Sequence, residues 1–256
     1  MTAVNRILRG DSWADALSER LKEGPDDGQS WMEQHTEVVK RDAYSSVGAI
    51  RVQDRHCFLK HYRSKGLLQA FLFRMGRGRG VASYDNAEAL QAAGVAVPAP
   101  LACLLIADGV MLLSEGIASG VDLKTLWLQG QSDAQLRRLM TTAALSLATL
   151  HVAGFSHGDC KWSNFLVVGD RMLLIDLEAV QSRSTLDAGC ARDLARFTVN
   201  AEDMGLSQSS FDAFLASYAK EVGKTPEAIS VLIVPWLEKL RQRHLKKYGR
   251  RGHALI

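Results

Sequence analysis

The chain has 256 residues, 47% of them apolar, which is enough for one large or two modest hydrophobic cores. Its 31 Lys and Arg against 28 Asp and Glu leave a net charge of +3, which points to no particular partner, and we expect no nucleic acid. Pro98, Pro100 and Asp108 interrupt the longest apolar run, and the first residues lack an apolar signal core. Four widely spaced cysteines without a metal-binding pattern favour a reducing, cytoplasmic location.

The first 36 residues are polar and rich in Gly, Asp and Ser near residues 24–30. We expect a loosely attached lead-in here, with one short helix from Trp13 to about Leu21. From Thr36 the pattern changes to strands, expected at residues 37–40, 48–52 and 57–62.

The last of these strands, Cys57 to Tyr62, carries a lysine in an apolar setting. The two-residue period of a strand places Phe58, Lys60 and Tyr62 on one face. Lys60 is therefore expected to point along an apolar surface. An ordinary solvated strand lysine is the other interpretation.

Two segments are basic and contain no acid. Residues 63–80 have an apolar centre between basic flanks, a pattern typical of a surface helix on an anionic membrane or of an insertion packed on the domain. Residues 239–251 carry seven Lys or Arg, for which a solvated tail is the default interpretation.

Further elements follow from periodicity and turn signals. Helical spacing predicts helices at 82–93, 209–222 and 226–247, and apolar runs predict strands at 98–106 and 110–116. Ser132 and Gln135 form a capping box that opens a helix ending at Gly154. His151 and His157 are interpreted as structural histidines, and the Cys160 thiol as a small packed side chain.

The most informative stretch runs from His157 to Glu178, HGDCKWSNFLVVGDRMLLIDLE. Its apolar runs, 165–168 and 172–175, flank a Gly-Asp turn and predict a β-hairpin. If Val168 pairs with Arg171, Asn164 and Asp176 emerge side by side at the open end. An amide oxygen and a carboxylate there suit Mg²⁺, which keeps several waters and takes few protein ligands. Asp159 and Lys161 lie just upstream and would flank the metal and any phosphate it holds.

The pattern H-G-D-x-K-x-x-N with I-D twelve residues later resembles the catalytic loop and metal-binding segment of the protein-kinase-like superfamily. Within that superfamily the chain is similar to the lipopolysaccharide kinase family over about residues 38–196. Gly158, in place of an arginine, and Leu177-Glu178 are departures from the protein kinases themselves.

The resemblance assigns roles to particular residues. It implies that Asp159 takes the proton of the acceptor hydroxyl with Lys161 beside it, and that Asn164 and Asp176 hold Mg²⁺. It also implies that Asp193 anchors the catalytic loop. On the nucleotide side it assigns the ATP phosphates to Lys60 and the adenine to backbone groups around Glu115.

Two features expected of the superfamily are absent from the sequence. The turn before the strand at 48–52 has no glycine-rich phosphate loop, so Ser45, Ser46 and nearby backbone would have to cover the phosphates. The helix at 82–93 has Ser83 where an acid should pair with Lys60, and Asp85 or Glu88 could substitute.

The fold class implied is α+β and protein-kinase-like, with a small β-rich N-lobe carrying one main helix and a larger, mainly helical C-lobe. We expect a lead-in at 1–36, the N-lobe at 37–115 and the C-lobe at 116–256.

The implied function is ATP-dependent phosphorylation of a heptose or Kdo hydroxyl in the lipopolysaccharide inner core. The cofactors would be ATP and Mg²⁺, and residues 63–79 and 239–251 would contact the anionic inner membrane peripherally. One alternative is a soluble kinase for aminoglycoside- or choline-type acceptors. Another is an inactive, lipid-associated binding protein.

Overall fold

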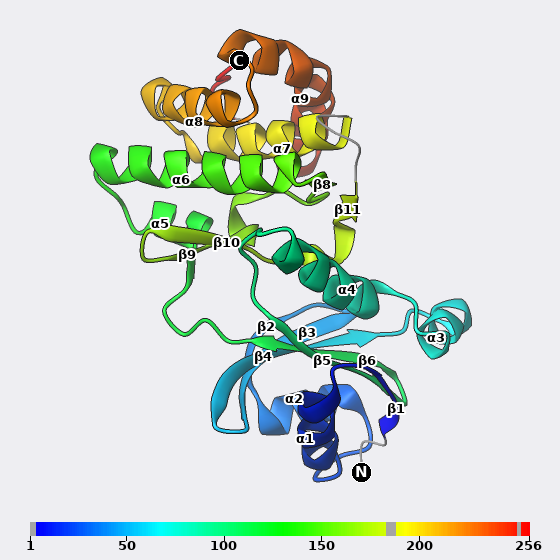
Figure 1. Ribbon diagram of the computed structural model, residues 1–256. Coiled ribbons are helices and arrows are strands. Elements are labelled where there is room, and N and C mark those ends of the chain that lie inside the picture. The colour runs from blue at the N-terminus through cyan, green and yellow to red at the C-terminus, as the bar shows by residue number, and fades with distance from the viewer. Residues whose placement is uncertain (1–3, 183–187, 250–251) are drawn as a thin grey trace. The chain divides into compact units, whose positions relative to one another are not determined.

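The computed structural model describes residues 4–182, 188–249 and 252–256 (Figure 1). The chain divides into two compact units. Unit 1 comprises residues 1–91 and 98–118, and unit 2 comprises residues 92–97 and 119–256. Unit 1 is built on an antiparallel sheet, whereas unit 2 is mainly helical, so the predicted α+β class with a β-rich and a helical part is confirmed.

The sheet of unit 1 has six antiparallel strands in the order β1-β5-β6-β4-β3-β2. Their alternating side chains give the sheet two apolar faces. Gln53 and Asp54 both adopt positive φ in the turn between β3 and β4, which is the geometry of a tight two-residue hairpin. The strands are β1 (Val4–Arg9), β2 (Glu37–Arg41), β3 (Ser45–Val52), β4 (Arg55–Arg63), β5 (Pro100–Ile106) and β6 (Gly109–Glu115).

One face of this sheet is covered by α1 (Asp11–Leu21) and α2 (Gly28–His35), as Figure 1 shows. Leu17, Leu21 and Trp31 are fully buried there against strand residues such as Leu59 and Leu113. The expectation of a loosely attached lead-in is therefore wrong for the described residues. The sequence did not predict β1 and α2, because their apolar runs are short and the strands they pack against come later in the chain.

The opposite face packs against α4 (Arg79–Ala92), the predicted main helix. Its residues Val81 and Tyr84 form a second core with Tyr62 and Leu112. A Cβ at Gly80 would lie 2.7 Å from Val110 Cγ1, so glycine lets the start of α4 approach the sheet closely.

The basic segment that precedes α4 forms α3 (Leu67–Arg74), which stands away from the sheet in Figure 1. Phe73 is the buried residue of this helix. Leu67 and Leu68 are 91% and 75% exposed, and Phe71 is 58% exposed, so the apolar side of α3 faces solvent.

Unit 2 contains five α-helices among its described residues. The long α6 packs against α8, and α7 packs against α9. The predicted capping box of Ser132 and Gln135 is present at the start of α6. Stacked Phe197 and Phe214, with ring centroids 4.2 Å apart, join α7 to α8. The helices are α5 (Leu123–Leu128), α6 (Asp133–Val152), α7 (Ala188–Met204), α8 (Gln208–Glu221) and α9 (Pro226–Tyr248).

The basic C-terminal segment is largely structured. Its first part is the end of α9, where Arg241 pairs with the fully buried Glu202 of α7 and also donates to the carbonyl of Ile256 at 2.8 Å. The Leu255 N–H donates to the same Glu202 carboxylate at 3.2 Å. The default interpretation of a solvated tail is therefore wrong for Arg241, because the buried Glu202 requires a cation, whereas Lys239, Arg243, Lys246 and Lys247 are exposed on α9.

Candidate active site

The predicted hairpin is present in unit 2. Strands β9 (Phe165–Val168) and β10 (Arg171–Leu174) pair antiparallel, with Val168 opposite Arg171. The ladder continues to the open end, where the Ile175 N–H donates to the Asn164 carbonyl at 3.0 Å. The predicted register is thus confirmed, and it places Asn164, just before β9, opposite Ile175, just after β10 and immediately before Asp176.

Asp176, two residues after the end of β10, has a left-handed conformation, with φ 64° and ψ 56°. This conformation is unusual for a residue other than glycine and is better tolerated by Asp than by most side chains. The short helix Leu177–Ala179 begins directly after it. The turn therefore stops the strand at the carboxylate that the register argument selected.

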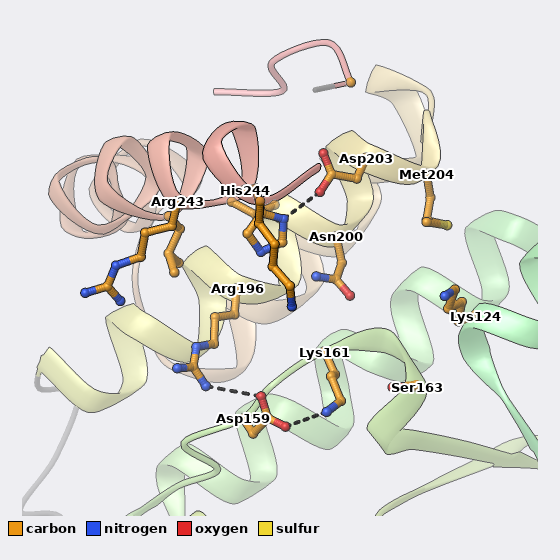
Figure 2. A pocket seen from close by; sticks show the side chains of 14 residues that line it. Lys124, Asp159, Lys161, Ser163, Arg196, Asn200, Asp203, Met204, Arg243 and His244 are labelled. Atoms are coloured by element: carbon orange, nitrogen blue, oxygen red, sulfur yellow. Dashed lines mark hydrogen bonds and ion pairs between the residues drawn. The ribbon is translucent and has the colours of Figure 1, made fainter. Parts of the chain in front are cut away.

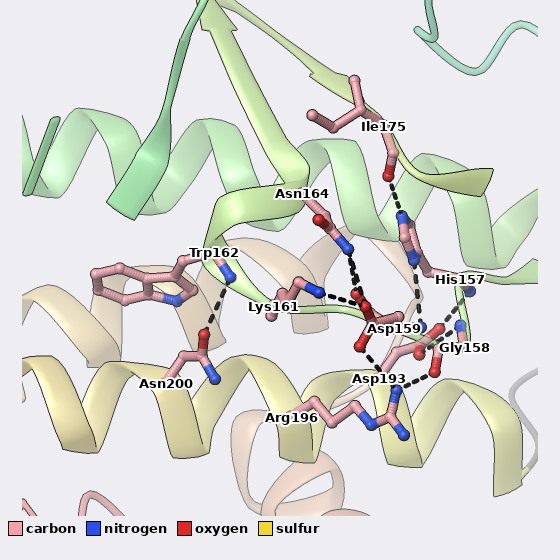
Figure 3. Close-up of polar contacts among 10 residues, drawn as sticks. All are labelled: His157, Gly158, Asp159, Lys161, Trp162, Asn164, Ile175, Asp193, Arg196 and Asn200. Carbon is pink, nitrogen blue, oxygen red and sulfur yellow. Dashed lines mark hydrogen bonds and ion pairs between the residues drawn. The ribbon is translucent and has the colours of Figure 1, made fainter. Parts of the chain in front are cut away.

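The catalytic loop gathers three of the predicted residues around one carboxylate (Figure 3). Lys161 Nζ donates to Asp159 Oδ2 at 2.7 Å. Asn164 Nδ2 donates to the Asp159 carbonyl at 2.8 Å and lies 3.3 Å from Asp159 Oδ2. The Asn164 amide nitrogen is therefore committed to the loop, and its oxygen is the atom suited to a cation.

Arg196 of α7 completes this arrangement, and sequence reasoning did not find it. Its Nη1 lies 3.3 Å from Asp159 Oδ1 and also donates to the Gly158 carbonyl. Asp159 is consequently held between two cations, Lys161 on its own loop and Arg196 from a distant helix. The one signal in the sequence was the spacing of Asp193 and Arg196, which puts both on the same side of a helix.

Asp193 of α7 holds the loop at His157 and Gly158 through hydrogen bonds, as the resemblance implied. It is 1% exposed and accepts hydrogen bonds from the backbone N–H groups of His157 and Gly158, the latter at 2.9 Å. Gly158 has φ +79°, and a Cβ there would lie 2.4 Å from the Ala179 carbonyl oxygen. Any larger side chain would clash, which accounts for glycine at this position.

His157 and Cys160 are structural, as predicted. His157 Nε2 lies 3.1 Å from the Ile175 carbonyl, and Nδ1 accepts the Asp159 N–H at 3.3 Å. Burial lowers the pKa of His157, so the ring stays neutral and joins the loop to the hairpin. Burial also raises the pKa of the Cys160 thiol, which makes it unreactive.

A cavity of about 970 Å³ adjoins Asp159 in unit 2 (Figure 2). The catalytic loop contributes Asp159, Lys161 and Ser163, and the remaining lining comes from α5, α7, α9 and the C-terminal segment. Those other residues are Lys124, Arg196, Val199, Asn200, Asp203, Met204, Leu240, Arg243, His244, Lys247 and Gly252. The carboxylate predicted to act as base therefore borders an open space lined by both polar and apolar residues.

In unit 1, Lys60 lies on β4 on the face that strand alternation predicted. Its Nζ is 4.7 Å from the centre of the Tyr62 ring, so the two side chains share that face. Neither proposed substitute for the helix acid pairs with it among the described residues. Asp85 is bound by Arg9 at 2.7 Å, and Glu88 is exposed beside Tyr84.

The two serines expected to cover the phosphates point in different directions. Ser45 Oγ donates to Asp42 at 2.7 Å and closes the turn between β2 and β3. Hydrogen bonds from the Tyr44 N–H and from Ser45 lower the pKa of Asp42, so the turn carries a negative charge. Ser46 of β3 lies opposite His61 of β4 in the strand register. Its side chain is therefore on the face of the sheet away from Lys60, and the residue is 5% exposed. Strand alternation thus keeps its side chain away from ligands on the Lys60 face.

Glu115 lies at the end of β6 and is engaged with the strand start at Ala99. Its carboxylate accepts the Ala99 N–H at 3.2 Å, and its own N–H donates to the Ala99 carbonyl at 2.8 Å. The Gly116 N–H donates to the His56 carbonyl at 3.0 Å. The N–H groups of Glu115 and Gly116 are therefore both used inside unit 1, and the Glu115 side chain is half-buried.

Comparison with known proteins identifies the group to which this arrangement belongs. The model of the lipopolysaccharide kinase (Kdo/WaaP) family matches residues 29–218, about three quarters of the chain. The chain belongs to the lipopolysaccharide kinase (Kdo/WaaP) family. The match covers the catalytic loop, the hairpin and α7, which hold the polar network around Asp159.

Two curated proteins illustrate the likeness within the lipopolysaccharide kinase family. A 3-deoxy-D-manno-octulosonic acid kinase of Vibrio vulnificus is 28% identical over 151 residues, covering 55% of this chain and 63% of that protein. The lipopolysaccharide core heptose(I) kinase WaaP of Pseudomonas aeruginosa is 26% identical over 157 residues, covering 56% and 59%. The match thus spans about three fifths of the length of these relatives.

Among solved structures, the BubR1 kinase domain aligns with a TM-score of 0.45 and 16% identity, covering 59% of this chain and 48% of that one. None of the helices in the described part of the chain is both long and apolar enough to cross a membrane.

Proposed function

We propose that the protein is an ATP-dependent kinase that phosphorylates a sugar hydroxyl of the lipopolysaccharide inner core. The observation that carries this proposal is Asp159, held by Lys161 and Arg196 at the edge of an open cavity. The names of its relatives, an octulosonic acid kinase and a heptose kinase, supply the acceptor class.

Asp159 would accept the proton of the acceptor hydroxyl while that oxygen forms its bond to the γ-phosphorus and the bond to ADP breaks. Lys161 and Arg196 hold the carboxylate in place at the edge of the cavity, where it can meet an acceptor hydroxyl. Their charges also favour the anionic transferring phosphoryl group.

The donor set at the hairpin end fits Mg²⁺. The Asn164 amide nitrogen donates to the Asp159 carbonyl, which leaves its oxygen for a cation, and Asp176 follows Ile175, whose N–H donates to the Asn164 carbonyl. Two oxygen donors suit an ion that retains water and substrate phosphate as further ligands. When bound, Mg²⁺ would neutralise charge on the ATP phosphates, with Lys60 as the expected phosphate contact in unit 1.

The direct test measures transfer of labelled phosphate from ATP to purified inner-core glycolipid, using the full chain and the variant Asp159→Asn. We expect transfer by the unaltered protein and loss of most turnover in the variant, with the exposed turn variant Asp170→Asn as a matched control. Transfer to small soluble aminoglycosides or choline with none to the glycolipid would support the soluble-kinase alternative instead.

A binding protein without catalysis is the second candidate, and one observation favours it. Both acids of α4 that could replace the missing helix acid have other neighbours, since Asp85 is bound by Arg9 and Glu88 lies beside Tyr84. Under this hypothesis the protein would bind Mg·ATP or glycolipid, yet the Asp159→Asn variant and the unaltered protein would show equal, background phosphate transfer.

We also propose that α3 docks on an anionic membrane, with the basic residues of 239–251 assisting. The large apolar side chains of α3 are exposed while Arg63, Lys65, Arg74 and Arg77 flank them, also exposed. That combination fits an interfacial helix, and each basic residue adds about 1 kcal/mol of attraction near an anionic leaflet. The site of action would be the cytoplasmic face of the inner membrane, where ATP is available.

Vesicles containing anionic lipid test this docking surface. Binding should weaken between 0.1 M and 1 M salt, because the Debye length shrinks from about 10 Å to about 3 Å. The double variant Leu67→Ser/Phe71→Ser should lose binding, whereas Leu128→Ser/Val231→Ser, equally exposed apolar positions elsewhere, should not. Salt-independent binding would contradict the proposal.

A further inference from the structure

We propose that the cavity beside Asp159 binds an anionic group of the acceptor, a carboxylate or a phosphate, and so selects acidic sugars. This inference rests on the proposed kinase function, because it names the class of acceptor that this site would take. It concerns residues of unit 2 alone, and neither the family match nor the sequence assigned Lys124 or Arg243 a role in binding the acceptor.

The cavity carries more positive than negative charge. Its lining includes Lys124, Lys161, Arg196, Arg243 and Lys247 against the carboxylates of Asp159 and Asp203. Each carboxylate already has a partner within the lining. Asp159 is paired with Lys161 and Arg196, and Asp203 lies 2.8 Å from His244 Nδ1.

Among the cations that line the cavity, Lys124 of α5 and Arg243 of α9 form no ion pair with a described carboxylate. Both are exposed, and neither contacts a carboxylate in the part of the chain that the structure describes. Figure 2 places Lys124 on one side of the cavity and Arg243 on the other, with Asp159 and Lys161 between them. Lys247, one turn beyond Arg243 on α9, adds a further positive charge.

The remaining lining suits the body of a sugar. Val199, Met204 and Leu240 form an apolar part, and Ser163 supplies a hydroxyl. The side-chain Oδ1 of Asn200 accepts the backbone N–H of Trp162 at 3.2 Å, which leaves the side-chain Nδ2 of Asn200 as a donor. A volume of about 970 Å³ accommodates a sugar residue with its substituents.

An anion bound in this cavity would lie away from the predicted metal ligands, and so from the phosphates of ATP. Among the described lining residues Asp159 and Lys161 are present, whereas Asn164 and Asp176, the predicted metal ligands, are not. An anion held by Lys124 and Arg243 would therefore lie on the acceptor side of Asp159. An acid such as an octulosonic acid brings a carboxylate of this kind, and a phosphorylated sugar brings a phosphate.

Binding in the absence of nucleotide tests the inference directly, with the full chain in 0.1 M salt and isothermal titration as the readout. The probes are 3-deoxy-D-manno-octulosonic acid and its methyl ester, and glucose 6-phosphate and glucose. We expect at least one acid to bind about tenfold more tightly than its neutral counterpart, because charge-assisted hydrogen bonds contribute about that factor. The carboxylate and phosphate pairs distinguish the two sources of charge.

The variant Lys124→Gln/Arg243→Gln removes the two cations, and Arg138→Gln/Lys224→Gln removes one Lys and one Arg that are exposed in unit 2 but do not line the cavity. The first pair should lose about tenfold in acid binding and raise the acceptor KM without changing the KM for ATP. The second pair should behave like the unaltered protein.

Three results would overturn the inference: equal binding of acids and neutral counterparts, no binding of either acid, or equal weakening in both double variants. These results are separate from failure of the kinase proposal. If the acids bind as expected and no phosphate reaches any core sugar, the proposed function is wrong and the anion site stands. If phosphate transfer occurs with no preference for acids, the kinase stands and the anion site is wrong.

Discussion

The loop around Asp159 in unit 2 and the strands of unit 1 predicted to bind nucleotide use their polar residues in different ways. Around Asp159, polar groups from a loop, a hairpin and α7 hold one carboxylate in place. In unit 1, two of the residues expected to bind nucleotide make contacts within their own unit. Ser45 closes a turn with Asp42, and the N–H of Glu115 donates to Ala99.

The difference shows which kind of site a short motif can describe. Asp159, Lys161 and Asn164 lie within six residues of one another, so their chemistry is visible as a sequence pattern. The phosphate-covering turn has neither glycines nor a cationic side chain of its own. Any contact it makes with ATP must therefore come from backbone groups, which every sequence has, and Lys60 remains the one side chain there with a clear expected role.

The largest effect on turnover should come from replacing Asp159, whose carboxylate is held by Lys161 and Arg196. Asp159→Asn removes the base while keeping shape and most hydrogen bonds, so turnover should fall by about 10²- to 10⁴-fold. ATP affinity, measured by equilibrium titration, should change little. A variant that retained near-full turnover would show that the ordered loop serves another purpose.

Asp193→Asn tests whether the loop is held from α7. The asparagine oxygen can accept one backbone N–H, but its amide group would face the other, leaving a buried donor without a partner. We expect a loss of about 2–3 kcal/mol in the free energy of unfolding, measured with urea. Asp170→Asn, at the exposed hairpin turn, should stay within about 0.5 kcal/mol of the unaltered protein. Similar losses in both variants would contradict the anchoring role.

Asp176→Ala tests the hairpin register as the basis of the metal site. Removing one of two predicted oxygen ligands should weaken Mg·ATP binding by about tenfold or more, because a charged interaction contributes about 1.5–3 kcal/mol. The matched change Asp170→Ala, on the same hairpin, should leave Mg·ATP binding unaltered. Equal effects, read by titration with and without Mg²⁺, would show that the open end of the hairpin is not the metal site.

The smallest effect is expected at Ser46 in unit 1. Its hydroxyl is buried on the face away from Lys60, and it has no hydrogen-bond partner among the residues that the structure describes. Ser46→Ala should leave ATP affinity within about twofold and raise the free energy of unfolding by up to about 1 kcal/mol. A marked loss of ATP affinity would mean that the serines bind phosphate after all, and would remove the contrast between the two regions.

Local sequence is sufficient for features that depend on near neighbours. Strand alternation placed Lys60 beside Tyr62, the Gly-Asp turn set the register from Val168 and Arg171, and the capping box opened α6. In each case the deciding hydrogen bonds or side-chain directions join residues a few positions apart. Their energies favour one local conformation whatever the rest of the chain does.

Tertiary structure decided the contacts between residues that are far apart in the chain. Arg196 reaches Asp159 across 37 positions, and Arg9 takes Asp85 across 76. The buried helices near the N-terminus likewise depended on a sheet whose strands come later. The cation-rich cavity exists only because α5, α7 and α9 converge on the catalytic loop. No short sequence pattern predicts these contacts, because the interaction of two charges depends on the distance between them, and here the tertiary packing sets that distance.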